Sequence, residues 1–163
     1  MALIKVFDNF LSEKDFNYVN NYCLTANYTY GERDNFDTPP VGMVSEIPLD
    51  SQITSLFQNV INQKISQVLP YNLYRSYINC FSPLENPYFH TDGDNGLTLL
   101  FYPNKEWSLN DNGETQILLK NQVDQIVGIF PIPNRMLVFD ASLLHRATSF
   151  RDKHRFTIAF KYN

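Results

Sequence analysis

The second half of the chain is divided into short apolar runs by clusters of Pro, Gly, Asn and Asp, and this spacing limits the fold more than any other feature. Short runs rich in aromatic and β-branched side chains, bounded by such turn residues, are typical of strands. Strands of this length bury their apolar faces by pairing into sheets that pack on one another. The pattern therefore predicts a mainly β (α+β) fold, a sandwich or a barrel, with strands at residues 71–81, 97–102, 115–119, 125–130, 136–139, 145–148 and 155–161.

Residues 1–70 predict two helices that pack outside one sheet. Ser12, followed by Asp15 three residues later, is typical of a helix N-terminus, and this helix would present Phe16, Val19 and Cys23 on its apolar face. An aspartate can cap the second helix, in which apolar residues recur at the helical spacing. The residues concerned are Asp50 as the cap and Ile53, Leu56, Phe57, Val60, Ile61, Ile65 and Val68 on the apolar face.

The segment 31–48, between the two helices, contains Pro, Gly and charged residues that interrupt every repeat, and it predicts one long loop. Long irregular loops are often functional, so this one is a candidate lid over a cleft. Tyr28, Tyr30 and Phe36 would then be candidate substrate contacts. Trp107 is either a substrate-facing aromatic residue or a packed turn residue.

Length, charge and cysteine content restrict the class of protein. At 163 residues the chain fits one domain, with 1–70 as helical support and 71–163 as the β core. A formal net charge of −4 disfavours binding to nucleic acid. Cys23 and Cys80 form no Cys-x-x-Cys pair, which favours free thiols in a reducing compartment. Without a signal-like or membrane-spanning run in the sequence, we expect a soluble cytoplasmic protein.

Two of the three histidines stand in positions that favour metal binding. His90 and Asp92 are two residues apart, and in an extended segment such side chains leave the same face. His145 follows an expected strand and a short turn, and it would complete a set of two histidines and one carboxylate. That set binds Fe(II) and leaves coordination positions open. His154 lies in the polar run "FRDKHRF", where a solvated side chain is expected.

An arginine lies ten residues after His145, the last of the candidate metal ligands. Arg155 begins the run "RFTIAFKY", in which it shares a face with Thr157 and Ala159. A guanidinium group aimed into a metal cleft can hold a dicarboxylate through two parallel hydrogen bonds. The alternative role for Arg155 is a structural salt bridge.

These segments together resemble a known enzyme family. The order "YINCFSPLENPYFHTDGDNGLTLLFYPNKEW", "NGETQI", "PIPNRMLVFDASLLHRAT" and "RFTIAFKY" is similar to that of the iron(II) and 2-oxoglutarate dependent dioxygenases, in particular the prolyl 4-hydroxylase-like branch. The resemblance covers roughly residues 74–162. It implies a double-stranded β-helix, or jelly roll, with supporting N-terminal helices, and Fe(II), 2-oxoglutarate and O2 as cofactor and cosubstrates.

The resemblance also implies roles for individual residues. His90, Asp92 and His145 would be the iron ligands, and Arg155 would pair with the distal carboxylate of 2-oxoglutarate. Tyr102, in "LLFYPNKEW", matches a tyrosine that contacts the same carboxylate, and Asn79 and Thr157 are further candidates for binding this cosubstrate. The chain departs from the family at Phe81, in "INCF", where these enzymes often have a tyrosine.

The sequence thus predicts an oxygenase that hydroxylates a C–H bond, with release of succinate and CO2. The resemblance favours a prolyl or other peptide residue as the target, while a small-molecule substrate stays open. A rival interpretation is a jelly-roll metal-binding or interaction module without turnover, including one that holds structural zinc. Structural zinc usually has four protein ligands, and only three converge here, so an open site is favoured. A lectin-like sandwich would use the strands and ignore the three candidate ligands.

Overall fold

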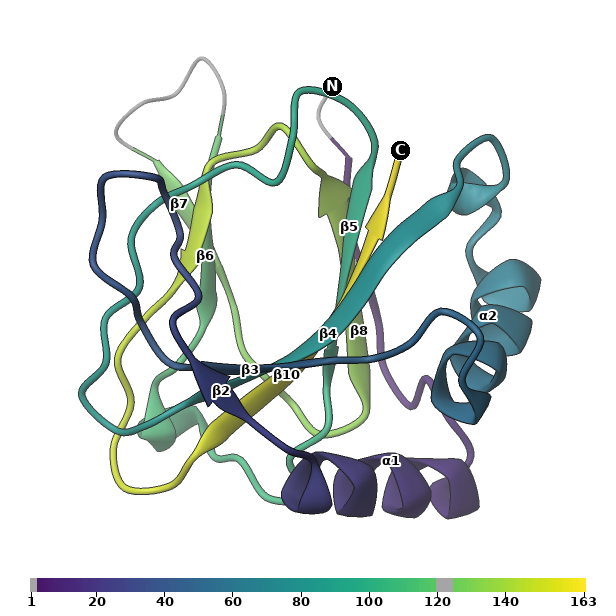
Figure 1. Cartoon of the computed structure of the whole chain (residues 1–163), viewed down its shortest axis with the longest axis horizontal. Coiled ribbons are helices and arrows are strands. Elements are labelled where there is room, and N and C mark those ends of the chain that lie inside the picture. Colours follow the sequence, from purple (N-terminus) through teal and green to yellow (C-terminus); the bar gives the residue numbers. More distant parts are fainter. Residues whose placement is uncertain (1–2, 120–124) are drawn as a thin grey trace.

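The computed structural model describes residues 3–119 and 125–163, which form two antiparallel sheets facing each other (Figure 1). The large sheet has the order β1 (Ile4–Phe7), β8 (Arg135–Asp140), β5 (Leu97–Tyr102), β10 (Arg155–Tyr162), β4 (Leu73–Phe81), β3 (Met43–Glu46) and β2 (Thr29–Tyr30). The small sheet has the order β7 (Ile126–Ile129), β6 (Thr115–Leu118) and β9 (His145–Ala147). Two 3-10 turns, η1 (Ser66–Val68) and η2 (Leu109–Asp111), complete the described elements.

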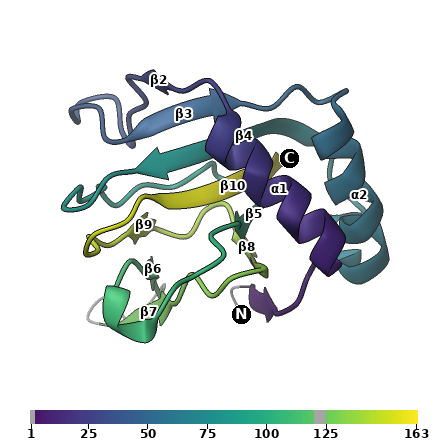
Figure 2. The ribbon, with the colours of Figure 1, turned by 90° about the horizontal axis from the view of Figure 1, so that it is seen from below.

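Two helices cover the outer face of the large sheet, away from the small one (Figure 2). α1 (Glu13–Thr25) begins after Ser12, whose hydroxyl accepts a hydrogen bond from the Asp15 amide at 3.2 Å, as the sequence predicts. α2 (Gln52–Lys64) is capped by Ser51, one residue after the expected Asp50. None of the helices within residues 3–119 and 125–163 is long and apolar enough to cross a membrane.

The central strand β10 carries apolar residues on one face and functional residues on the other. Ile158 and Phe160 pack in the core under the helices, where the Phe160 and Phe57 rings lie 4.7 Å apart. The alternate residues face the space between the two sheets, among them Arg155 and Lys161. β10 pairs with β4 from Arg155 onward and with β5 from Ile158 onward, so its polar side chains are held at fixed positions inside the molecule.

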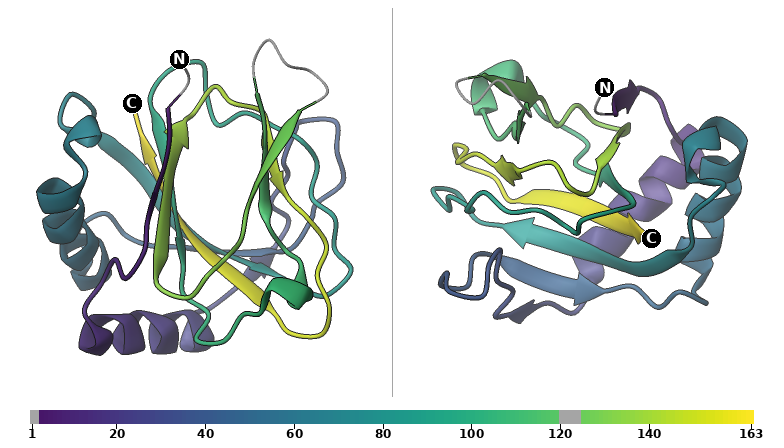
Figure 3. Two further views of the ribbon diagram at one scale, coloured as in Figure 1. Left: turned by 180° about the vertical axis from the view of Figure 1, so that it is seen from behind. Right: turned by 90° about the horizontal axis from the view of Figure 1, so that it is seen from above.

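Seven expected strands are present with small shifts at their ends, and three further strands were not expected. β1 pairs with β8 at one edge of the large sheet (Figure 3). β3 lies inside the segment 31–48 and pairs with β4, so the prediction of one loop over that whole segment was wrong. The pairing partner holds β3 in place, because its four residues carry no alternation long enough to specify a strand. The irregular part of the segment comprises residues 31–42 and the two residues that follow β3, 47 and 48.

Candidate active site

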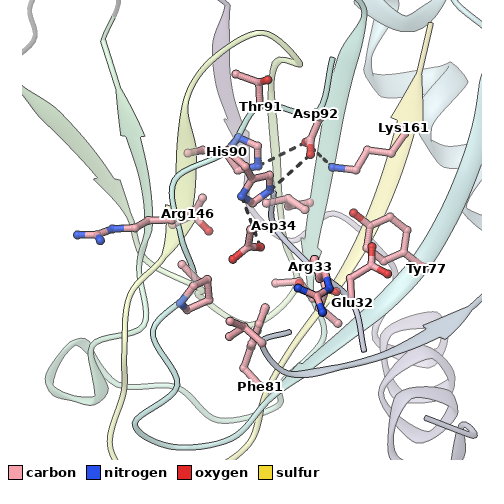
Figure 4. A pocket seen from close by; sticks show the side chains of 18 of the residues that line it. Glu32, Arg33, Asp34, Tyr77, Phe81, His90, Thr91, Asp92, Arg146 and Lys161 are labelled. Atoms are coloured by element: carbon pink, nitrogen blue, oxygen red, sulfur yellow. Dashed lines mark hydrogen bonds and ion pairs between the residues drawn. The ribbon is translucent and has the colours of Figure 1, made fainter. Parts of the chain in front are cut away.

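A polar cavity of about 240 Å³ lies between the two sheets (Figure 4). Strands β4 and β10 of the large sheet form one wall, and β6 and β9 of the small sheet form the other. His90, Asp92 and His145 line this cavity together with Arg155 and Lys161. The sequence-predicted metal ligands and the sequence-predicted arginine therefore share one enclosed space.

An isolated antiparallel bridge brings the two histidines together. The amide and carbonyl groups of His90 and His145 exchange hydrogen bonds of 3.1 and 2.9 Å, and the two rings lie 4.4 Å apart. The Asp92 amide donates to the Ala141 carbonyl at 2.9 Å, which fixes the aspartate beside them. One ligand atom from each of the three side chains lies within 4.8 Å of the others, so the set can hold a single metal ion.

The hydrogen bonds of both imidazoles leave the same nitrogen free for a metal. Nδ1 of His90 lies 3.0 Å from the Tyr88 carbonyl, and Nδ1 of His145 lies 2.9 Å from the Leu143 carbonyl. A carbonyl only accepts, so each Nδ1 donates its hydrogen there and each Nε2 keeps its lone pair. The Nε2 atoms lie 3.6 and 3.4 Å from the Asp92 carboxylate oxygens. This arrangement orients metal-binding histidines and fits a resident metal ion.

Burial and nearby charges set the charge state of the ligands. Burial lowers the pKa of His145 to about 4, against the opposing effect of Asp92. Burial alone would raise the pKa of Asp92, but Lys161 and His145 outweigh it and lower that pKa to about 2. At neutral pH the site therefore contains a carboxylate and a neutral His145 imidazole, which are the forms that bind metal.

Metal-free protein should lose stability on mild acidification because of His145. The unfolded chain binds a proton near the ordinary histidine pKa of about 6.5, while folded His145 does so only near pH 4, so the free energy of unfolding falls as pH falls between these values. The slope from this residue is at most about 1.4 kcal/mol per pH unit. Urea unfolding in chelator at several pH values checks it. His145→Gln should remove this dependence of the unfolding free energy on pH. His154→Gln, which changes an exposed histidine, should retain it. Equal slopes in the two variants would show that His145 is not the residue responsible.

Asp92 has outer partners that the sequence reading missed. The ammonium group of Lys161 contacts Oδ2 of Asp92, and the Thr98 hydroxyl donates to the same oxygen at 2.5 Å. Burial alone would lower the pKa of Lys161, but Tyr77 and Asp92 raise it, so the lysine carries a charge. The strand pattern contained a signal for this residue, because Lys161 continues the alternate face that begins at Arg155.

Arg155 is buried with hydrogen-bond partners but without an ion-pair partner among the described residues. Its Nε donates to the Gly113 carbonyl at 2.8 Å and its Nη2 to the Thr115 hydroxyl at 3.0 Å. Burial lowers its pKa, while Tyr102 and Glu114 act in the opposite direction. A buried cation that faces a cavity without a counter-ion is a site for an anionic ligand. The alternative role for Arg155, a structural salt bridge, finds no carboxylate partner within residues 3–119 and 125–163.

Thr115 was not identified from the sequence, since nothing local distinguishes it. Its hydroxyl group also lies 2.8 Å from the Tyr102 hydroxyl, so it links the tyrosine to the arginine. Tyr102 is fully buried and does not itself line the cavity, whereas Thr115 does. The carbonyl that holds Arg155 comes from Gly113, where φ is +79° and a Cβ would lie 2.8 Å from Trp107.

The other sequence-predicted residues divide between the cavity and the core. Asn79, Thr157 and Phe81 line the cavity. Trp107 does not line the cavity. Its indole N–H donates to the Asn112 carbonyl at 2.8 Å and its ring packs on Phe150, as expected for a packed turn residue. The candidate substrate contacts Tyr28, Tyr30 and Phe36 do not line the cavity.

The irregular segment 31–42 contributes to the cavity mouth instead through Glu32, Arg33, Asp34 and Val41. Asp34 connects this segment to the histidine region, because its carboxylate accepts a hydrogen bond from the Tyr88 amide at 2.7 Å and lies 3.5 Å from Nδ1 of His90. The segment is therefore packed beside the ligands, which places it within reach of anything bound there.

Comparison with known proteins identifies the family. Residues 79–163, just over half of the chain, match the model of the 2OG-Fe(II) oxygenase superfamily. The chain therefore belongs to the 2OG-Fe(II) oxygenase superfamily. A search of curated protein sequences found no match.

Solved structures match over nearly the whole chain at low identity. A prolyl-4-hydroxylase from Pseudomonas putida has a TM-score of 0.76 at 13% identity, with 98% of this chain and 91% of that chain covered. A prolyl hydroxylase from Trichoplax adhaerens, in complex with a peptide fragment of a hypoxia inducible factor, has a TM-score of 0.74 at 16% identity, with 98% and 82% covered. A viral collagen prolyl hydroxylase from Paramecium Bursaria Chlorella virus-1, in complex with 2-oxoglutarate, has a TM-score of 0.68 at 15% identity, with 98% and 94% covered.

These similarities confirm the predicted double-stranded β-helix with supporting helices. The family and the His90, Asp92 and His145 triad together define a 2-oxoglutarate and Fe(II) dependent dioxygenase. The residues fit both groups. Two Nε2 atoms and a carboxylate converge for iron, and Arg155, which has no ion-pair partner among the described residues, fits an anionic cosubstrate. Cys23 and Cys80 lie in the core under the helices, away from the triad, and supply no fourth ligand for structural zinc.

Proposed function

We propose that the protein hydroxylates a C–H bond of a prolyl or other peptide residue and releases succinate and CO2. The observation that carries this proposal is the shared cavity, which is lined both by three metal ligands and by a buried arginine that has no ion-pair partner in the described part of the chain. An open metal site next to an anion site is what a dioxygenase with a dicarboxylate cosubstrate needs, and it has no purpose in a structural metal module. The prolyl hydroxylases among the structural neighbours suggest the peptide substrate.

The residues around the cavity have distinct roles in this proposal. Iron held by the triad together with 2-oxoglutarate supplies the oxidising power when bound. Arg155 binds the distal carboxylate of the cosubstrate, and the Gly113 carbonyl and the Thr115 hydroxyl hold its guanidinium group in a fixed orientation. Tyr102 acts through Thr115, while Asn79 and Thr157 offer polar groups along the cavity wall. The apolar ring of Phe81 covers part of the cavity and offers no hydrogen bond.

Thr115→Val should weaken 2-oxoglutarate binding by about tenfold. The substitution keeps the shape but removes the hydroxyl that orients both Arg155 and Tyr102, and a hydrogen bond to a charged group contributes roughly 1.5–3 kcal/mol. Titration of 2-oxoglutarate into Mn(II)-loaded protein measures the change. Thr91→Val, an exposed threonine at the cavity mouth, is the matched control and should bind like wild type. Unchanged binding in the Thr115 variant would remove this residue from the proposed cosubstrate site.

Succinate measurement tests the reaction class. Protein loaded anaerobically with Fe(II) is mixed with 2-oxoglutarate, oxygen is admitted, and succinate is quantified with and without a library of proline-containing peptides. We expect stimulation by one group of peptides and a product heavier by one oxygen atom. The same peptides with alanine in place of proline should stimulate less. Stimulation by free amino acids or other small molecules, but not by peptides, would replace the peptide proposal; no succinate under any condition, despite bound iron and cosubstrate, would favour a binding module.

A further inference from the structure

Lys161 is a buried cation in contact with the metal-binding carboxylate. Figure 4 shows its side chain extending from β10 toward Asp92. Only 5% of the residue is exposed. The ammonium group contacts Oδ2 of Asp92, lies 3.5 Å from the Thr98 hydroxyl and lies 5.7 Å from the centre of the Tyr77 ring. The binding of iron and cosubstrate proposed above assigns no role to this lysine.

The two oxygens of the Asp92 carboxylate have different contacts. Oδ2 accepts from Lys161 and from Thr98. Oδ1 lies 3.6 Å from Nε2 of His90, and Oδ2 lies 3.4 Å from Nε2 of His145. Within the described residues no side chain donates a hydrogen bond to Oδ1. Oδ1 is therefore the oxygen that can bind the metal while Lys161 stays on Oδ2. The lysine and a metal ion can share this aspartate without competing for one atom.

The lysine changes the charge of the site. Among the three metal ligands, Asp92 supplies the negative charge of a carboxylate. Lys161 cancels that charge from a position where little water can screen it. Arg155, on the same face of β10, adds a positive charge, and Asp34, 3.5 Å from Nδ1 of His90, adds a negative one at the mouth. Removing the charge of Lys161 alone would therefore leave the Asp92 carboxylate without the cation that contacts it.

We propose that Lys161 sets the charge balance of the iron centre, weakening its hold on the divalent metal and strengthening the hold of the metal-loaded site on the dianionic 2-oxoglutarate. A fixed positive charge next to the ligand set repels the metal and attracts the anion. The effects on the two ligands therefore have opposite signs. This inference rests on the proposed function for its cosubstrate half, while its metal half depends only on the triad.

Two titrations of Lys161→Met test the inference. Methionine has a similar length and apolar stem but lacks the charge. We expect Mn(II), titrated without cosubstrate, to bind about tenfold more tightly than to wild type, and 2-oxoglutarate to bind about tenfold more weakly to the Mn(II)-loaded variant. Lys64→Met is the matched control. Lys64 also forms one tertiary hydrogen bond, to the Phe10 carbonyl at 2.7 Å, but it lies on α2 away from the cavity, so both affinities should stay unchanged.

Other results would overturn the inference. If both ligands bind more weakly, Lys161 only orients Asp92 or supports the fold; if the metal affinity does not rise, its charge does not act on the metal. Lys161→Gln, which keeps a hydrogen-bond donor without the charge, should give the same opposite changes and serves if the methionine variant does not fold. Failure of wild type to bind 2-oxoglutarate would instead refute the proposed function, and the metal titration would still decide the role of Lys161.

Discussion

Asp92→Ala should lower Fe(II) affinity more than about 100-fold and abolish succinate formation. Outer partners of metal ligands alone cost about 10–100-fold when removed, and this substitution removes a ligand and the site's own negative charge. Anaerobic Fe(II) titration and the succinate measurement check both parts. Asp94→Ala changes an exposed aspartate two residues further along the same loop and should behave like wild type. Full metal binding by the Asp92 variant would show that these three residues do not form the metal site.

The same substitution should also destabilise the protein, for a reason separate from metal binding. It leaves the Lys161 ammonium group buried without its partner, and breaking a buried ion pair from one side costs roughly 3–5 kcal/mol. The double variant Asp92→Ala/Lys161→Met removes both charges and should recover most of that loss in a urea unfolding experiment. It should still fail to bind Fe(II). If the double variant recovers its stability and still does not bind Fe(II), the loss of metal binding is due to the missing ligand and not to unfolding.

Features that depend on local pattern could be predicted from the sequence. Ser12 caps α1 where its side chain predicts it, and the interior strand β5 has the predicted bounds, since its apolar run ends at turn residues on both sides. The short strands at or near the edges of the large sheet could not be predicted in this way. β1 and β3 are short, and the register of each is imposed by the neighbouring strand rather than by its own alternation.

The candidate site shows the same division between local and tertiary information. His90 and Asp92 are two residues apart, so their convergence follows from an extended backbone, and His145 reaches them through a single cross-strand bridge. Thr115 and Lys161 have no such signature. Thr115 has a role only because Arg155 reaches it from another sheet, and Lys161 only because Asp92 lies above its strand. Threonine and lysine have many structural uses, so the roles of these two residues can be recognised only from the partners that the fold places beside them.

Arg155→Met should reduce the affinity for 2-oxoglutarate about 100-fold or more while leaving metal affinity near that of wild type. Losing one partner of a buried, hydrogen-bonded charge pair typically costs 2–5 kcal/mol, roughly 30- to several-thousand-fold in affinity. Arg155 contacts none of the triad residues through a hydrogen bond or ion pair, so the metal ligands should keep their geometry. Titration of Mn(II), and then of 2-oxoglutarate into the Mn(II)-loaded protein, measures the two affinities separately.

Arg151→Met is the control, because Arg151 is exposed and hydrogen-bonds a backbone carbonyl, that of Asn110, at 2.7 Å. It should bind both ligands like wild type. Arg155→Lys tests the geometry as well as the charge. A lysine ammonium group keeps the charge but cannot bond Gly113, Thr115 and a carboxylate in one plane, so its cosubstrate affinity should fall between those of wild type and Arg155→Met. If all three variants bind 2-oxoglutarate equally well, the buried arginine serves the fold alone, and the cosubstrate carboxylate must be held elsewhere in the cavity.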